Sequence, residues 1–143
     1  DGAEVLTASR DRTAKLWSAS SGLCRLTLEP HGDAVASAAF SSDGAAVVTA
    51  SLDLKTRVWS PASGQCLLTL AGHAGAISSA VFSPDCAWVA TASSDRTARL
   101  WAIGGAEERL KLMHDFSSLA TSTTQAISRS SFGEKSSRLW EQS

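Results

Sequence analysis

The sequence is poor in several residue types, and each shortage argues against a class of protein. Its 143 residues include no tyrosine, one methionine, three prolines and three cysteines. An odd number of cysteines argues against a disulfide framework and favours a reducing, intracellular and thus cytoplasmic location. No run of about 18 apolar residues is present, so no segment is expected to span a bilayer as a helix.

The sequence also lacks an excess of either positive or negative charge. The formal net charge is −1, with 19% charged and 43% hydrophobic residues. This balance is typical of a folded globular chain. It argues against nucleic acid or an anionic membrane as the partner, because the chain has no excess of positive charge to attract either one.

What the chain does contain is a repeated phrase that ends in tryptophan. It reads TASRDRTAKLW over residues 7–17, TASLDLKTRVW over 49–59 and TASSDRTARLW over 91–101. A weaker copy, SSFGEKSSRLW, covers residues 130–140, so the four tryptophans stand 42, 42 and 39 residues apart. A period of this length predicts stacked structural repeats.

Short segments with β periodicity surround each phrase and are separated by turn signals such as Asp43-Gly44. Alternation and turn spacing predict about four short strands per repeat, joined as an antiparallel meander. The expected strands are 4–9, 13–17, 22–28, 34–40, 46–51, 55–59, 65–70, 76–82, 88–93, 97–101 and 107–112. One such sheet would be too small to be stable alone, so the repeats are expected to stack.

The full pattern resembles the WD-repeat β-propeller family. Its elements are Gly72-His73, a strand, a serine–proline–aspartate turn, an S/T-x-S-x-D segment and the closing tryptophan. The resemblance implies an all-β fold whose blades are four-stranded antiparallel meanders. The aspartate that follows the family's tryptophan is absent, because Ser18, Ser60, Ala102 and Glu141 stand there. Cys86 replaces a turn glycine, which predicts local strain if that position needs positive φ.

This interpretation divides residues 1–143 into a partial propeller. Blade 1 is partial and covers 1–29, blade 2 covers 30–70, blade 3 covers 71–112, and 113–143 form a degenerate partial blade or a tail. Closed propellers need four to eight blades, so we expect an incomplete ring. The remaining blades would come from further sequence or from a second copy of the chain.

The resemblance also implies a buried hydrogen-bonded chain of tryptophan, serine or threonine, histidine and aspartate within each blade. Histidine precedes aspartate by 22 residues and tryptophan by 28 in two repeats. The expected chains are Trp59–Thr49–His31–Asp53 and Trp101–Thr91–His73–Asp95, while Thr7, Asp11 and Trp17 lack a histidine.

These residue types also occur in hydrolase triads. Their recurrence in every blade favours a structural role over catalysis, so we expect no enzyme and no cofactor. Metal binding is not expected either, because the histidines fall in separate repeats and no C-x-x-C or H-x-x-x-H motif occurs.

Family behaviour points to the turn within each repeated phrase as a partner-binding surface. Its variable positions are Arg10, Arg12, Leu52, Leu54, Ser94 and Arg96. Leucines are unusual in turns, so Leu52 and Leu54 either form an apolar contact for a protein or pack locally. Trp88, which lies outside the tryptophan register, is either interblade packing or an exposed anchor.

The sequence therefore predicts a non-catalytic scaffold that binds other proteins. The alternatives are a purely architectural propeller segment and a scaffold associated with nucleic acid. The latter would use Lys15, Arg57, Arg99 and Arg138, each two residues before a tryptophan. We expect instead that their stems pack between blades while their charges reach the rim. Among the cysteines, Cys24 and Cys66 are expected to be buried and Cys86 to be an accessible thiol.

Overall fold

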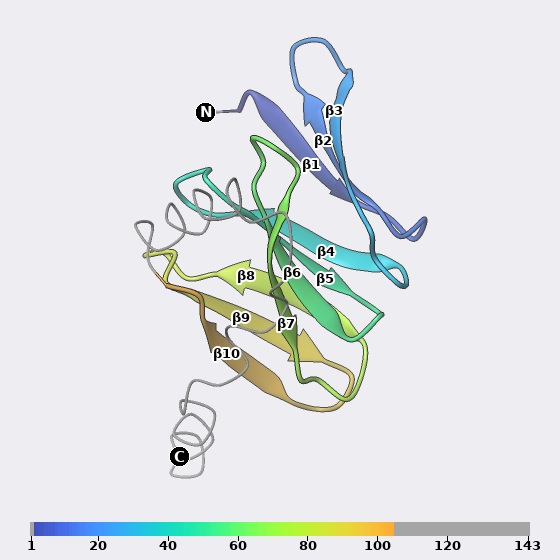
Figure 1. Ribbon diagram of the computed structural model, residues 1–143, viewed down its shortest axis with the longest axis vertical. Helices are drawn as coiled ribbons and strands as arrows, with labels where there is room; N and C mark the ends of the chain where they lie inside the picture. The colour runs from blue at the N-terminus through green and yellow to red at the C-terminus, as the bar shows by residue number, and fades with distance from the viewer. Residues whose placement is uncertain (1, 105–143) are drawn as a thin grey trace, which may run out of the picture.

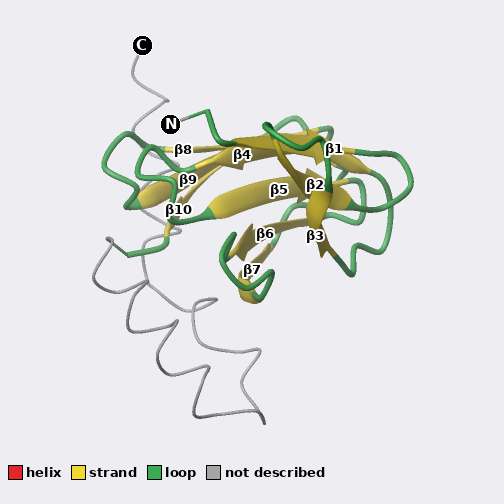
Figure 2. Ribbon diagram, turned by 90° about the horizontal axis from the view of Figure 1, so that it is seen from above, coloured by secondary structure: helices red, strands yellow, loops and turns green. Residues whose placement is uncertain are grey.

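The computed structural model of the protein describes residues 2–104. Within this range the chain forms strands joined by loops and no helix (Figure 2). The strands are β1 (Glu4–Ala8), β2 (Ala14–Ser18), β3 (Cys24–Leu28), β4 (Val35–Phe40), β5 (Val47–Ser51), β6 (Lys55–Trp59), β7 (Cys66–Ala71), β8 (Ile77–Phe82), β9 (Trp88–Ser93) and β10 (Ala98–Ala102). The all-β prediction is confirmed. The expected strand 107–112 and the fourth repeat, with Arg138, lie outside the described residues.

The strands form three antiparallel sheets that follow one another along the chain. Their orders are β1-β2-β3, β4-β5-β6-β7 and β8-β9-β10. We call these sheets blade 1, blade 2 and blade 3. Figure 1 shows them stacked in sequence order, with blade 1 at one end and blade 3 at the other. They form no closed ring within residues 2–104.

Tight turns fix the register of neighbouring strands. In the β4–β5 turn, the Asp43 carboxylate accepts hydrogen bonds from the Ser41 hydroxyl and from Ala45 N–H. Gly44 follows with a φ of 69°, a conformation that glycine adopts without steric cost. The matching residue in blade 3 is Cys86, and it takes the same left-handed conformation with a φ of 58°. The β8–β9 turn therefore has a positive φ at a position where cysteine stands in place of glycine.

Two apolar clusters hold the blades together, one at each seam. Ala14, Leu16 and Leu28 of blade 1 pack on Val35, Val47 and Trp59 of blade 2. Ala46, Val48, Ala50, Val58 and Leu70 of blade 2 pack with Ile77, Ala80, Val89 and Ile103, which belong to blade 3 and the residues directly after it. Blade 2 is therefore buried on both faces. Full burial of a valine or leucine stabilises a fold by about 1.5–3 kcal/mol, so these seams contribute substantially to stability.

The outer faces of blades 1 and 3 are exposed. Val5 of β1 is 50% exposed, whereas Val47, at the same repeat position in blade 2, is fully buried. Leu100 of β10 is 51% exposed, whereas its equivalent Val58 is fully buried. The sequence places apolar side chains at these positions in all three blades, but only blade 2 has a neighbour on each side within the described residues.

The cysteine expectations were partly wrong. Cys24, on the last strand of blade 1, is exposed, whereas Cys66, on the last strand of blade 2, is half-buried and packs against the cluster between blades 1 and 2. Cys86, expected to be accessible, is only 3% exposed, and its Sγ lies 3.1 Å from the Ser42 hydroxyl of the neighbouring blade. The side chain of this turn residue fills the seam between blades 2 and 3.

None of the described residues belongs to a helix that could cross a membrane.

Candidate functional site

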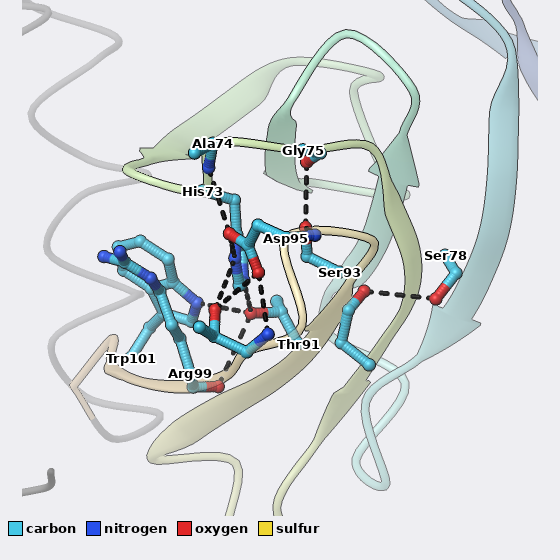
Figure 3. Close-up of polar contacts among 11 residues, drawn as sticks. His73, Ala74, Gly75, Ser78, Thr91, Ser93, Asp95, Arg99 and Trp101 are labelled. Carbon is cyan, nitrogen blue, oxygen red and sulfur yellow. Dashed lines mark hydrogen bonds and ion pairs between the residues drawn. The ribbon is translucent and has the colours of Figure 1, made fainter.

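Blade 3 contains an unbroken chain of four polar side chains (Figure 3). Trp101 Nε1–H of β10 donates to Thr91 Oγ1 of β9 at 2.9 Å. Thr91 Oγ1 lies 2.8 Å from His73 Nε2, and His73 Nδ1 lies 2.7 Å from Asp95 Oδ2. With the ring proton on Nδ1, the threonine hydroxyl donates to Nε2 and every link has one donor and one acceptor. The chain joins the β7–β8 loop, two strands and the β9–β10 turn.

Asp95 is the end of this chain and gathers most of its bonds. Its carboxylate accepts the Thr97 hydroxyl at 2.6 Å, Thr97 N–H at 2.8 Å and Ala74 N–H at 3.0 Å, in addition to His73. The hydrogen bond from the Thr97 side chain, followed by those from His73 and Ala74, holds the pKa of Asp95 well below its ordinary value, against the opposing effect of desolvation. Asp95 is therefore an anion that ties the turn to the histidine loop.

Blade 2 begins the same chain but does not complete it. Trp59 Nε1–H donates to Thr49 Oγ1 at 2.9 Å, and His31 Nε2 lies 2.9 Å from the same oxygen. The expected bond between His31 and Asp53 is absent, and the prediction was wrong at this link. His31 Nδ1 is buried without a hydrogen-bond partner of good geometry among residues 2–104.

Asp53 is directed elsewhere because it pairs with an arginine. Its Oδ2 lies 2.9 Å from Arg57 Nη1 and accepts Gly32 N–H at 2.8 Å. Both side chains of the ion pair are nearly buried, at 11% and 10% exposure. The expectation that the charge of Arg57 reaches the rim was therefore wrong. Burial acts to raise the pKa of Asp53, but the Gly32 N–H and Arg57 together lower it overall.

Burial lowers the pKa of His31, and the nearby Arg57 charge lowers it further. The Asp53 carboxylate and the backbone carbonyls of Arg12 and Leu28 act in the opposite direction without reversing the shift. His31 is therefore a neutral ring in the folded protein, held by one strong hydrogen bond instead of two.

A neighbouring residue explains why the arginines of blades 2 and 3 differ. In blade 3, Arg99 lies over the Trp101 ring, 5.9 Å from its centroid. A Cβ at Gly72 would lie 3.0 Å from Arg99 Nη1 and 3.2 Å from the Trp101 ring. Blade 2 has Pro30 at the position of Gly72. We infer that the proline ring fills this space, so that Arg57 turns to Asp53 instead.

Blade 1 has the shortest version of the chain. Trp17 Nε1–H donates to Thr7 Oγ1 at 2.9 Å, as in the other blades. Asp11 accepts the Thr13 hydroxyl at 2.7 Å and Thr13 N–H at 3.0 Å, which shape its turn. Lys15 lies over Trp17, 5.9 Å from the ring centroid. Asp11 and Thr7 are exposed, and no histidine of the described residues joins them.

These chains show little capacity for chemistry. Thr91 and Thr49 are buried, and each hydroxyl is held between an indole and an imidazole, so neither faces a substrate. In the part of the chain that the structure describes, no three histidine, cysteine, aspartate or glutamate side chains are grouped as a metal site would require. The arrangement instead satisfies polar groups where strands and turns meet.

Comparison with protein families agrees with this repeated geometry. The model for "WD domain, G-beta repeat" (WD40) matches residues 22–60 and 64–102, which together make up more than half of the chain. The protein belongs to the WD40 repeat family. A search of curated proteins found no match. WD40 repeats generally serve as protein-interaction scaffolds and are usually non-catalytic.

The predicted partner-binding residues of this WD40 chain lie at one end of its sheets. They occupy the β1–β2, β5–β6 and β9–β10 turns, which Figure 1 places along the same side of the stack. All six are exposed. We call them the turn-end surface: Arg10, Arg12, Leu52, Leu54, Ser94 and Arg96.

The turns that carry this surface share one hydrogen-bond pattern. In the β5–β6 turn, the Ser51 hydroxyl accepts Asp53 N–H at 3.1 Å and Asp53 Oδ1 accepts Lys55 N–H at 3.1 Å. The next position, Leu54, has a φ of 69°. Its WD40 equivalents Arg12 and Arg96 have φ values of 74° and 67°. Each turn thus holds one side chain on a left-handed residue.

Trp88 lies at the opposite end of the blade from this surface. It begins β9, whose other end leads into the β9–β10 turn, and it is half-buried. Trp88 N–H donates to the Ser83 hydroxyl at 3.0 Å, which closes the β8–β9 turn. The structure therefore does not bring Trp88 together with the six turn residues.

The Asp53–Arg57 pair is the feature that sequence reasoning missed. The two residues are four apart across a turn, and the same residue types occur at 95 and 99 without pairing. The one usable signal was Pro30 in place of the glycine that precedes histidine.

Proposed function

We propose that this chain is a non-catalytic scaffold that binds other proteins through the turn-end surface. The observation that carries the proposal is the exposure of Leu52 and Leu54, each 40% exposed at the tip of a tight turn. Exposed apolar residues gathered on a rigid element are typical of protein contacts. The turn is rigid because its backbone is bonded through Ser51 and Asp53.

The neighbouring turns suggest the chemistry of the partner. Arg12 and Arg96 occupy the position of Leu54 in blades 1 and 3. An apolar centre flanked by positive charge favours a peptide segment that carries both apolar and acidic residues. Nucleic acid is less favoured, because Arg57 is already paired with Asp53 while Lys15 and Arg99 lie over tryptophan rings.

Selection of displayed random peptides against the chain would supply defined ligands for a test. We expect the double substitution Leu52→Asp and Leu54→Asp to weaken binding of the selected peptides by about tenfold or more, as loss of a contact centre does. Stability should be unchanged, because both side chains are exposed and aspartate tolerates positive φ.

A matched control adds the same charge at the other end of the sheets. Ala62→Asp with Gln65→Asp lies in the exposed β6–β7 turn and should leave peptide affinity unchanged. If the selected peptides bind the leucine variant as tightly as the parent, the turn-end surface is not the site. If selection yields no binding peptide, the purely architectural alternative is favoured.

A further inference from the structure

The turn-end surface presents its side chains as a row, because its three turns belong to three stacked sheets. The β1–β2, β5–β6 and β9–β10 turns follow one another in blade order along one side of the stack (Figure 1). Face-to-face sheets pack about 10 Å apart, so neighbouring turns are spaced by about that distance. The seams between the sheets are buried, and the Ser9 carbonyl of the β1–β2 turn accepts Val35 N–H of blade 2 at 2.9 Å. These contacts hold the row rigid.

The row is cationic at both ends and apolar in the middle. Arg10 and Arg12 lie in the β1–β2 turn, Leu52 and Leu54 in the β5–β6 turn, and Arg96 in the β9–β10 turn. All are exposed, and the ion pairs among residues 2–104 are made by other residues. The arginines are therefore available to an anionic partner on either side of the leucines.

An acidic residue beside the central turn reinforces this order. Asp33 is exposed, and its backbone carbonyl accepts the Ser51 hydroxyl at 3.1 Å, at the end of β5 that leads into the turn. Blade 3 has Gly75 at the equivalent position. Because like charges repel, a partner carboxylate is disfavoured over the leucines and favoured over the flanking arginines.

We propose that the turn-end surface binds a polyproline II segment in which an acidic, an apolar and a second acidic residue follow at every third position. A polyproline II helix has three residues per turn and rises about 3.1 Å per residue, so every third side chain lies on one face, about 9 Å from the last. This spacing matches the row of turns. Proline fits the positions between, because the conformation needs no internal hydrogen bond. The inference rests on the proposed function of this surface.

Other peptide conformations match the row less well. In a β-strand, side chains at every third position alternate between opposite faces, so neighbouring acidic and apolar residues do not both reach the turns. An α-helix covers the same distance in about seven residues, but a helix bound in this way buries a continuous apolar stripe. Only the central turn of the row is apolar.

Fluorescence polarisation with defined peptides tests the register. The probe is the capped and labelled heptapeptide Glu-Pro-Pro-Leu-Pro-Pro-Glu, titrated with the full 143-residue chain. We expect saturable binding. Removing one proline from each side of the leucine, or adding one to each side, should weaken binding by about fivefold or more, because both acidic residues leave their arginines. The inverted peptide Leu-Pro-Pro-Glu-Pro-Pro-Leu should also bind more weakly, since its acid lies over the leucines.

A double-mutant cycle assigns the acidic residues of the peptide to the arginines. Arg12→Gln and Arg96→Gln keep an unbranched side chain at each left-handed position, so the unfolding midpoint should not change. Each should weaken binding of the heptapeptide by about two- to fivefold, the size of an exposed charge pair. Neither should alter binding of the matched peptide in which glutamine replaces both glutamates.

Several results would overturn the proposal. A heptapeptide that does not bind, or that binds equally well at every spacing, would exclude the polyproline II register. Tighter binding of an alanine-rich helical peptide with the same three residues about seven positions apart would assign the row to a helix. If randomly selected peptides need Leu52 and Leu54 while the heptapeptide fails, the surface still binds proteins and only the register is wrong. Selected peptides that are insensitive to both leucines would reject the surface and the register together.

Discussion

Blades 2 and 3 carry the same tryptophan, threonine, histidine and aspartate at the same spacing, yet their polar chains differ. In blade 3, His73 lies between Thr91 and Asp95. In blade 2, the aspartate instead pairs with Arg57, and the strong hydrogen bond that His31 keeps is the one to Thr49. Blade 2 is the better packed of the two and has the less complete polar chain. Apolar burial and polar completeness are therefore separate contributions to a blade's stability.

The difference also shows that the network residues alone do not determine the network. Arg57 and Arg99 are the same residue type at the same position, but one pairs with an aspartate and the other lies over a tryptophan. Several of their neighbours differ, and among them blade 2 has Pro30 and Lys55 where blade 3 has Gly72 and Thr97. We infer that the space before the histidine and the hydroxyl after the aspartate determine which partner the carboxylate takes.

The largest expected effect comes from removing a seam tryptophan. Trp59 is 1% exposed and belongs to the cluster between blades 1 and 2. Trp59→Ala should lower the free energy of unfolding by about 3–5 kcal/mol, the usual cost of truncating a large buried side chain. Trp101→Ala should cost less, because Trp101 is only partly buried. Urea denaturation of both variants would measure the difference, and equal losses would contradict the contrast in packing.

Removing the aspartate should affect blade 2 more than blade 3. Asp53→Asn leaves the nearly buried Arg57 without its counter-ion, and we expect a loss of about 1–3 kcal/mol. Asp95→Asn leaves no buried charge without a counter-ion, because Arg99 lies over Trp101, and should therefore cause a smaller fall in the unfolding midpoint. Chemical denaturation at neutral pH compares them. A larger loss for Asp95→Asn would show that the complete chain matters more than the buried ion pair.

Acid should reveal the neutral histidine of blade 2. The pKa of folded His31 lies below its ordinary value of 6.5, first because of burial and then because of Arg57. Between pH 7 and pH 5 the unfolded chain therefore binds a proton that the folded chain resists. Stability should fall as the pH falls through this window, by at most about 1.4 kcal/mol per pH unit for this group.

The His31→Gln variant isolates this contribution. Its stability should change less between pH 7 and pH 5 than that of the parent, while both should behave alike above pH 7.5, where the imidazole is neutral in both states. Thermal melts across this range measure the slopes. Identical slopes in the parent and the variant would show that His31 titrates normally.

The smallest effect tests the origin of the difference directly. Pro30→Gly should open the space that Gly72 provides in blade 3, so that Arg57 moves over Trp59 and Asp53 turns to His31 Nδ1. Stability should change by less than about 1 kcal/mol, because the new hydrogen bond offsets the flexibility that glycine adds to the unfolded chain.

A crystal structure or imidazole ¹⁵N shifts would report the new bond to His31. Gly72→Ala is the matched counterpart, since its Cβ would press on Arg99 and Trp101 and should displace the arginine. An unchanged Arg57–Asp53 pair in Pro30→Gly would exclude the proline as the cause.

The fold could be predicted because its signals repeat. The 42-residue period, the alternation and the turn residues located every described strand to within about two residues, and the WD40 assignment is confirmed. The resemblance to WD repeats, carried over by residue position, also implied the contacts of His73 with Thr91 and Asp95, which the structure contains. The division into blades by residue number remains a prediction, as does the binding role of the turn-end surface.

The features that could not be predicted depend on how side chains pack between blades and not on residue spacing in the sequence. We attribute the redirection of Asp53 to the limited room that Pro30 leaves for the Arg57 guanidinium, and residue spacing carries no information about that room. The burial of Cys86 follows from a turn of blade 3 that lies against Ser42 of blade 2. Both require knowledge of how neighbouring repeats touch.

The left-handed residue of each repeated turn has a consequence for protein engineering. Arginine, leucine and arginine occupy this position with φ values within a few degrees of one another. The backbone conformation of the turn is therefore the same for either side chain at this position. Residues 12, 54 and 96 could therefore be varied together in a library to obtain new binding specificities without a change of the backbone.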